Sequence, residues 1–293
     1  MSAPQSGPAV TIRRAKPEDA PACGRICYDA FRKINADHNF PPEIPSAEAG
    51  VRMMTQMFTH PLFYCVVAEQ DGRVAGSNCL DERSSVAGIG PITIDPAAQN
   101  AGIGRALMTA VMDRTRGRGN PGVRLVQVAF HSRSLSLYTK LGFDAREPLS
   151  LMQGEPLRKK IDGCVVRLAL GSDLEACNRV CGQVHGHDRG GEVADALKQG
   201  SAHVVERHGR ITGYTTGFAY FGHSVAESNL DLQALIGAAE SFASSPGFLL
   251  PTRNAALFRW CLENGLRVQY PMTLMTVGLY NEPNGAWLPS ILY

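Results

Sequence analysis

The sequence predicts an α/β fold of the α+β kind, arranged as two similar units in tandem. Strand-like and helix-like apolar patterns alternate along the chain. Three stretches also recur in the same order: residues 19–27 and 173–181 share five of nine positions, residues 69–76 resemble 206–213, and residues 131–152 align without a gap with 254–275. Repeats in a fixed order indicate two folded units of one design, and 293 residues are enough for two hydrophobic cores.

The first unit is expected to alternate strands and helices in a definite order. Pro17 and Ser46 mark the starts of the first two helices, and Gly72 closes a hairpin turn. The expected elements are a strand at 10–15, helices at 17–31 and 46–57, hairpin strands at 64–69 and 73–76, a strand at 84–94, a helix that carries Leu107, Met108, Val111 and Met112 on one face, a strand at 124–130 and a helix at 132–143.

A glycine-containing turn joins the strand that ends at Ile94 to the amphipathic helix that follows. The first-turn amides of a helix have no partner within the helix and lie at the positive end of its dipole, so such a turn suits phosphate. Gly102 and Gly104 lack side chains, which lets their amides approach a ligand closely. Gln99 and Arg105 can add donors at the rim.

The spacing of the glycines narrows the class of phosphate ligand. The sequence has no Gly-x-x-x-x-Gly-Lys-Ser/Thr loop, and Gly102-x-Gly104 lacks the third glycine of the dinucleotide fingerprint. What remains is Gln-x-x-Gly-x-Gly, from Gln99 to Gly104, followed by an apolar helix. An ordinary strand-to-helix turn is the alternative at this point.

A second pattern lies downstream, where a strand leads into Ser-Leu-Tyr-x-x-Leu-Gly-Phe at residues 136–143. In this order, the two patterns resemble the coenzyme A pyrophosphate loop and the other signature of the GCN5-related N-acetyltransferase (GNAT) superfamily. The resemblance spans about residues 10–152. It implies two tandem GNAT-like domains, each with a mixed, mostly antiparallel central sheet flanked by helices.

The resemblance also implies roles for single residues. Tyr138 matches the tyrosine that donates a proton to the departing coenzyme A thiolate, and a phenol of pKa about 10 keeps its proton at neutral pH. A packing aromatic is the alternative. His131 stands where the family often has Asn, either as a tether of the backbone or as a titrating group. The implied acetyl-CoA-binding residues are Ile92, Thr93, Ile94, Gln99, Asn100, Ala101, Gly102, Ile103, Gly104, Arg105, His131 and Ser134.

The general base and the acceptor site follow less directly from the sequence. Asp81 and Glu82 are candidates to relay the amine proton through water, and a solvated charged loop is the alternative. Phe31, His38 and Phe40 are expected to bind the acceptor from a loop between the first two helices.

The second unit lacks the phosphate-binding turn and the tyrosine of the first. Residues 222–230 contain no Gln-x-x-Gly-x-Gly, Glu227 would repel a pyrophosphate, and Cys261 aligns with Tyr138. We therefore expect three parts: a catalytic GNAT domain at 1–156, a linker at 157–163, and a degenerate GNAT-like domain at 164–293 that shapes the acceptor site and ends in an ordered tail at the cleft between the domains.

The composition argues against a protein that binds nucleic acid, membranes or metal ions. A net charge of +2 with interspersed signs gives no field for nucleic acid or acidic membranes. No apolar stretch approaches a membrane span, and residues 1–8 lack the apolar core of a signal peptide, so we expect a cytoplasmic protein with reduced, buried cysteines. The cysteine spacing completes no zinc set, and the glycines around His185 and His187 favour a flexible loop, so no metal is expected.

The sequence therefore predicts an N-acetyltransferase that moves an acetyl group from acetyl-CoA, as co-substrate, to a primary amine of a small molecule by direct attack. The alternative is a non-catalytic acyl-CoA-binding sensor or scaffold. The expected partner is the small-molecule amine, with no nucleic acid and no membrane, and a homodimer is left open.

Overall fold

The computed structural model describes residues 10–99, 102–242 and 247–293. Backbone contacts divide the chain into two compact units. Unit 1 holds the residues up to 82 together with 88–120, and unit 2 holds 83–87 together with 121–293. Each unit contains helices packed on antiparallel strands, so the predicted α+β class is confirmed.

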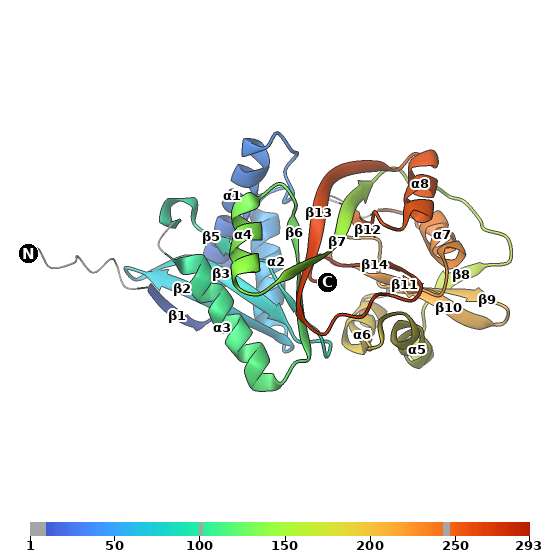
Figure 1. Cartoon of the computed structure of the whole chain (residues 1–293), viewed down its shortest axis with the longest axis horizontal. Helices are drawn as coiled ribbons and strands as arrows, with labels where there is room; N and C mark the ends of the chain where they lie inside the picture. The colour runs from blue at the N-terminus through green and yellow to red at the C-terminus, as the bar shows by residue number, and fades with distance from the viewer. Residues whose placement is uncertain (1–9, 100–101, 243–246) are drawn as a thin grey trace, which may run out of the picture. The chain divides into compact units, whose positions relative to one another are not determined.

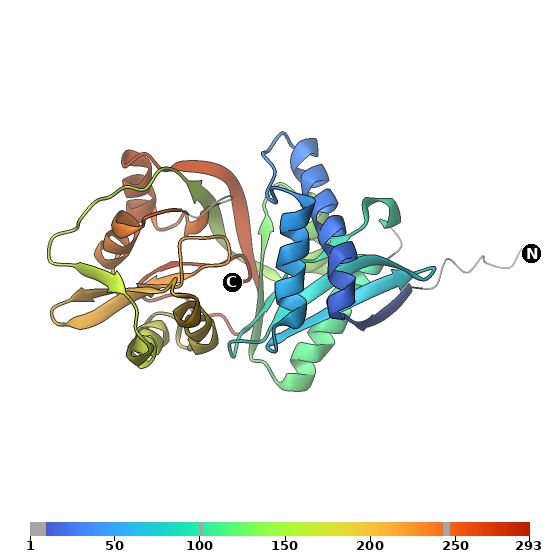
Figure 2. The same ribbon diagram turned by 180° about the vertical axis from the view of Figure 1, so that it is seen from behind.

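Unit 1 is an antiparallel sheet with helices on both faces (Figures 1 and 2). Its strands pair in the order β1-β2-β3-β4, and β5 also pairs with β3. The helices α1 and α2 lie side by side on one face, and α3 covers the other. The elements are β1 (Val10–Arg14), a 3-10 turn (Pro17–Asp19), α1 (Ala20–Asp37), α2 (Ala47–Thr59), β2 (Phe63–Gln70), β3 (Arg73–Asp81), β4 (Ala87–Ile89), β5 (Thr93–Ile94), a 3-10 turn (Pro96–Ala98) and α3 (Ile103–Arg118).

Local sequence explains how α1 and α2 begin and why they pack closely. The predicted cap Ser46 accepts a hydrogen bond from the Ala49 amide at 3.2 Å, which starts α2. Gly24 on α1 faces α2, where an added Cβ would lie 2.4 Å from the Cα of Val51. The two backbones therefore approach to a distance that no larger residue at position 24 permits.

Unit 2 contains two antiparallel sheets (Figure 1). One has the strand order β6-β13-β7-β12, and the other has the order β14-β11-β10-β9-β8, with α5 and α6 on one side and α7 on the opposite side. The elements are β6 (Gly122–Val128), α4 (Ser132–Lys140), β7 (Asp144–Gln153), β8 (Val165–Leu168), a 3-10 turn (Gly171–Asp173), α5 (Leu174–His185), α6 (Gly190–Gln199), β9 (His203–Arg207), β10 (Arg210–Thr215), β11 (Ser224–Ala226), α7 (Asn229–Ala238), β12 (Phe248–Pro251), α8 (Ala255–Glu263), β13 (Arg267–Gly278) and β14 (Ala286–Leu288).

The strand β13 explains why the compact units divide where they do. It pairs with β6 through Met272 and Val128, and with β7 through Met272 and Leu149, so it separates two strands that are consecutive in the sequence. Residues 121–153 therefore share a compact unit with the second half of the chain. The predicted linker at 157–163 marks a boundary of the sequence repeat, whereas the contacts divide the chain after Asn120.

The linker and the C-terminal segment both pack on unit 2. Leu157 and Ile161 lie against its apolar core, and β14 pairs with β11. The side chain of Tyr293 is only 2% exposed.

All eight cysteines are free thiols, and seven of them are buried. Within the described ranges, no helix has the length and apolar character needed to cross a bilayer.

Candidate active site

The turn before α3 has features suited to binding a phosphate. Gly102 is the N-cap of α3 at φ +77°, no side chain in the described ranges caps the helix, and no acidic residue lies in its first turn. The left-handed φ favours glycine, and a Cβ at Gly102 would meet nothing within 4 Å. The amides of the first turn therefore keep their hydrogen-bonding capacity for a ligand.

The other predicted residues of this turn differ in exposure. The side chain of Ile103 is only 2% exposed, so Ile103 can offer a ligand only its backbone. Gln99 and Gly104 are half-buried, and Arg105 is exposed. The predicted contacts Asn100 and Ala101 lie outside the described residues.

The short strand β5 directs backbone groups away from its partner. The Asp95 amide donates to the Ala75 carbonyl at 2.9 Å. Because hydrogen-bonded pairs alternate along an antiparallel ladder, the preceding residue, Ile94, turns its N–H and C=O away from β3. Ile92 is half-buried and Thr93 is buried. The amide of Ile94 is thus the one best oriented to meet a ligand at this edge.

Tyr138 lies on α4 in unit 2, with His131 and Ser134 on the same helix face because their spacing is three and then four residues. Ser134 Oγ and His131 Nδ1 are 2.7 Å apart. The ring of Tyr138 is 6% exposed and packs edge-on against Phe143, with 6.2 Å between centroids. Burial raises the pKa of Tyr138 to about 12, although a hydrogen bond with Ser134 opposes the rise. The phenol therefore keeps its proton throughout the neutral range.

The two candidate bases lie at the end of β3. Asp81 is the last residue of the strand and is 5% exposed. The Glu82 carboxylate accepts hydrogen bonds from Arg114 at 2.8 and 3.1 Å, and Arg118 Nε lies 3.2 Å from it. Glu82 thus has two cationic partners, which gives it a structural role whether or not it takes part in catalysis.

The predicted loop between the first two helices is shorter than expected, so the expectation that Phe31 lies in it is wrong. Phe31 lies within α1, and His38 is the C-cap of that helix. The helix continues past Phe31 because no breaker interrupts it, and Lys33 pairs with Asp37 at 2.8 Å one turn later. Phe40 follows in the connection and is half-buried. These positions leave the predicted acceptor role of all three residues untested.

The expectation that His185 lies in a flexible loop is wrong, and the sequence pattern alone assigns no role to Arg124. His185 ends α5 and is 1% exposed, because Asn281 Nδ2 donates to its carbonyl at 3.0 Å and the Trp287 ring packs on it. Arg124 is also 1% exposed. The only sign of Arg124 in the sequence was a charged residue within the apolar strand pattern at 124–130. Across the described residues, no group of three or more His, Cys, Asp or Glu is placed to hold a metal ion.

Comparison with known proteins finds acetyltransferases. Residues 29–143 match the model of the Acetyltransferase (GNAT) family. The chain is 30% identical over 166 residues to a mycothiol acetyltransferase from Cellulomonas flavigena, an alignment that covers 53% of this chain and 46% of the relative. It is 26% identical over 161 residues to an IAA acetyltransferase from Azospirillum brasilense, covering 51% of this chain and 99% of the relative.

The fold of the whole chain also has a counterpart. An acetyltransferase structure from Pyrococcus horikoshii superposes with a TM-score of 0.71 at 18% identity and covers 94% of both chains. That likeness concerns the fold alone. The chain spans less than half the length of the curated mycothiol acetyltransferases that it matches. Over residues 29–143, the chain is thus similar to the acetyltransferases of the GNAT family.

Proposed function

We propose that this protein transfers an acetyl group from acetyl-CoA to a primary amine of a small molecule. The observation that carries the proposal is the uncapped N-terminus of α3, with Gly102 at φ +77° and no acidic side chain in the first turn. Diphosphate charge at that end is favoured by the helix dipole and by the unpaired amides. The match of residues 29–143 to the GNAT family supports the same assignment.

The proposed reaction is a direct attack. The amine nitrogen bonds to the thioester carbon, the carbon–sulfur bond breaks, and the electron pair goes to the coenzyme A sulfur. The Ile94 amide is proposed to hold the acetyl oxygen and Tyr138 to donate its proton to the sulfur as the negative charge forms there. Because the pKa of Tyr138 is raised to about 12, the donor is fully protonated when the charge appears.

The proton that leaves the amine is proposed to reach Asp81 or Glu82 through water. Glu82 also binds Arg114 and Arg118, and both acids are proposed as candidates for the base. The second half of the chain is proposed to shape the acceptor site without catalysing transfer itself.

A small-molecule acceptor is supported by the names of the relatives, which refer to mycothiol and IAA. Phe31, His38 and Phe40 remain the proposed acceptor contacts. We also propose a cytoplasmic protein that engages neither nucleic acid nor membrane, since the net charge of +2 gives no strong field. A homodimer is compatible with this proposal.

The test is calorimetric titration of acetyl-CoA into the wild-type protein and into Gly104→Glu. A carboxylate in the first turn of α3 opposes the diphosphate, so we expect affinity to fall at least about 10-fold. Gly117→Glu is the matched control, because Gly117 lies in the same helix, is exposed, and has free space around its Cβ. If wild-type protein gave no heat with acetyl-CoA, or if both variants bound equally, the proposal would fail.

A thiol-release assay over a panel of primary amines then separates the enzyme from the alternative acyl-CoA sensor. Turnover of any amine at a rate that depends on both substrates supports the transferase. Tight acetyl-CoA binding with no thiol release across the panel would favour the sensor.

A further inference from the structure

A buried guanidinium in unit 2 lacks the partner that its charge requires. The side chain of Arg124, on β6, is 1% exposed, and its Nε and Nη2 atoms have no hydrogen-bond acceptor. The rings of Tyr293 and Tyr280 flank it, with centroids 3.7 and 5.3 Å from its Cζ. Among the described residues, no carboxylate pairs with Arg124. Burial and the neighbouring charge of Arg189 lower its pKa to about 9.

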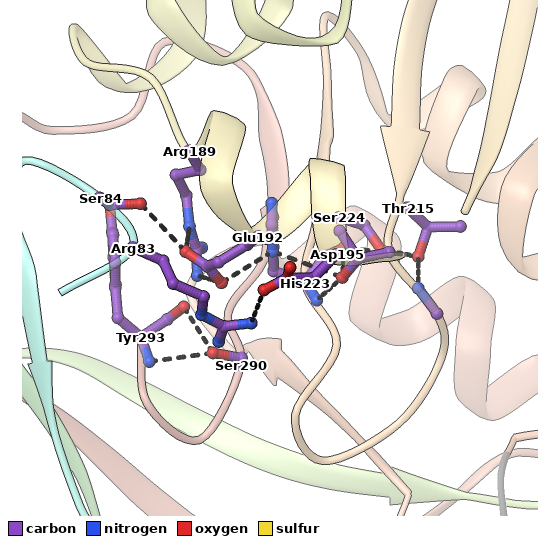
Figure 3. Close-up of polar contacts among 12 residues, drawn as sticks. Arg83, Ser84, Arg189, Glu192, Asp195, Thr215, His223, Ser224, Ser290 and Tyr293 are labelled. Atoms are coloured by element: carbon purple, nitrogen blue, oxygen red, sulfur yellow. Dashed lines mark hydrogen bonds and ion pairs between the residues drawn. The ribbon is translucent and has the colours of Figure 1, made fainter. Parts of the chain in front are cut away.

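Two other arginines of unit 2, Arg189 and Arg83, already have their carboxylates (Figure 3). Arg189 donates to Glu192 at 2.8 and 2.6 Å, and His223 Nδ1 lies 3.2 Å from the same carboxylate. Arg83 pairs with Asp195 at 3.3 Å. Each of these acids is matched to an arginine, so neither neutralises Arg124.

His185 adds a second unpartnered group to the same cluster. It is 1% exposed, and neither ring nitrogen has a partner. Its ring lies 6.0 Å from that of Tyr293 and 5.3 Å from that of Trp287. Burial and the surrounding cations hold the pKa of His185 well below its usual value, so the ring is neutral and carries one N–H donor. The adjacent carboxylate of Asp188 is exposed and accepts a backbone amide.

Burying a charged group without a partner costs far more than burying it with one. An oxyanion beside Arg124 would accept from Nε and Nη2 in the fork geometry that arginine offers to carboxylate and phosphate. The stacked tyrosine rings fix the plane of that fork.

We propose that Arg124, assisted by His185, forms a binding site for the oxyanion group of a small organic ligand, a carboxylate or a phosphate. The anion has two conceivable sources: an acidic group on the acceptor amine, or a separate anion that regulates the protein. The site stands on the contacts of unit 2 and does not depend on acetyl transfer.

Direct binding is measured with acetate, glutarate and inorganic phosphate as probes. Trp287 packs on His185, so its fluorescence in a Trp260→Phe background reports on the site, and calorimetry gives the affinity. We expect at least one probe to bind and Arg124→Met to weaken it about 10- to 100-fold, as expected for loss of a charge-assisted fork. Arg146→Met is the matched control, because Arg146 also lies against Tyr280 but donates to Thr276 and Asp144.

The ligand-free protein provides a second readout. Removing an unpaired buried charge relieves its desolvation, so Arg124→Met should melt no lower than the wild type. If Arg124→Met unfolds, Arg124→Lys keeps the charge without the fork and should bind the probe more weakly than the wild type. A strong loss of stability in both variants, with no probe binding in the wild type, would show that Arg124 is a structural group satisfied by the rings and by water.

Kinetics distinguish the two sources of the anion. If the acceptor carries it, the wild type should use an acidic amine at least about 10-fold better in kcat/KM than its neutral analogue, and Arg124→Met should remove this preference. If a separate anion binds, added probe should change kcat/KM for neutral amines in the wild type alone. Arg124-dependent binding without any turnover would refute acetyl transfer and keep the site, whereas turnover with no such binding would refute the site and keep acetyl transfer.

Discussion

The two halves of the sequence repeat, residues 1–156 and 164–293, share one ion-pair motif with nearly the same atomic contacts. In both copies an arginine on the first strand forms two hydrogen bonds of 2.6 to 3.1 Å with an aspartate at the helix start, and also binds a glutamate on a neighbouring strand. In both, the aspartate accepts a backbone amide at 2.8 Å. The residues are Arg13 with Asp19 and Glu69, and Arg167 with Asp173 and Glu206.

The halves differ at the N-terminus of one helix, which is α3 in the first half and α7 in the second. The N-terminus of α3 is left open by Gly102. The N-terminus of α7 is closed, because Ser228 Oγ accepts the Asp231 amide and the Asp231 carboxylate lies in the first turn. Arg207 donates to that carboxylate at 2.9 and 3.2 Å, and Thr212 donates at 2.6 Å. An incoming phosphate would have to displace a buried, fully bonded carboxylate.

The comparison separates a feature that both halves share from features that only one of them has. A motif that ties the first strand to the first helix is needed wherever the fold is built, so both halves keep it. An open helix N-terminus contributes nothing to stability, and the second half has replaced it with a capped one. The same holds at the position of Tyr138, where Cys261 fills the equivalent place as a small buried side chain.

The largest expected effect is on the chemistry of the first half. Tyr138→Phe should lower kcat about 100- to 10,000-fold, because the departing sulfur would lose its proposed proton donor, while affinity for acetyl-CoA stays unchanged. Thiol release and calorimetry measure the two quantities. The matched change Cys261→Ala should leave kcat within about two-fold. Equal losses in both variants, or loss of binding in Tyr138→Phe, would mean that the tyrosine only supports packing.

The shared ion-pair motif predicts matched losses of stability. Arg13→Met and Arg167→Met each leave an aspartate, Asp19 or Asp173, without its cation, and should cost about 1–3 kcal/mol. Circular dichroism follows unfolding of the whole chain, and both tryptophans, Trp260 and Trp287, lie in the second half. Fluorescence should therefore report Arg167→Met more strongly than Arg13→Met. A loss in only one half would show that the two motifs are not equivalent.

The sign of the pH dependence follows from the same pairs. Hydrogen bonds from Arg13 and Arg167 hold the pKa of Asp19 and of Asp173 below the ordinary value of 3.8. The pairs therefore stabilise the protein fully above that value, and this stability is lost as the pH falls through the lowered pKa. The difference between wild type and Arg13→Met should shrink on acidification below pH 3.8. A difference that grew on acidification would contradict the pairing.

Most of the fold was predictable because each element carries a local signal. Ser46 caps α2 as expected, and Gly102 opens α3 as the glycine pattern indicates. The strand expected at 84–94 is instead two short strands, β4 and β5, whose registers on β3 differ by one residue. The placement of β13 between β6 and β7 could not be derived from the sequence. Strand order depends on pairing between segments that lie far apart in the chain.

The candidate site rests on patterns of spacing in the sequence. The glycine turn and Tyr138 stand out because they lie at fixed intervals, and their roles stay predictions. Glu82 could not be recognised as the partner of Arg114, which lies far along the chain. The isolation of Arg124 was equally hidden, because a missing partner is a property of the packed interior and not of the strand that carries the charge.

The smallest effect separates the two helix N-termini. Ser228→Ala removes the cap of α7 and should cost about 1 kcal/mol of unfolding free energy. Gly102→Ala should cost a similar amount, about 1–2 kcal/mol, because alanine is strained at φ +77°. Thermal melts compare the two losses, and titration with acetyl-CoA tells the variants apart. Only Gly102→Ala should weaken acetyl-CoA binding, because only the α3 turn is proposed to bind the diphosphate. Equal acetyl-CoA affinity in both variants would show that the open N-terminus of α3 does not contribute to binding.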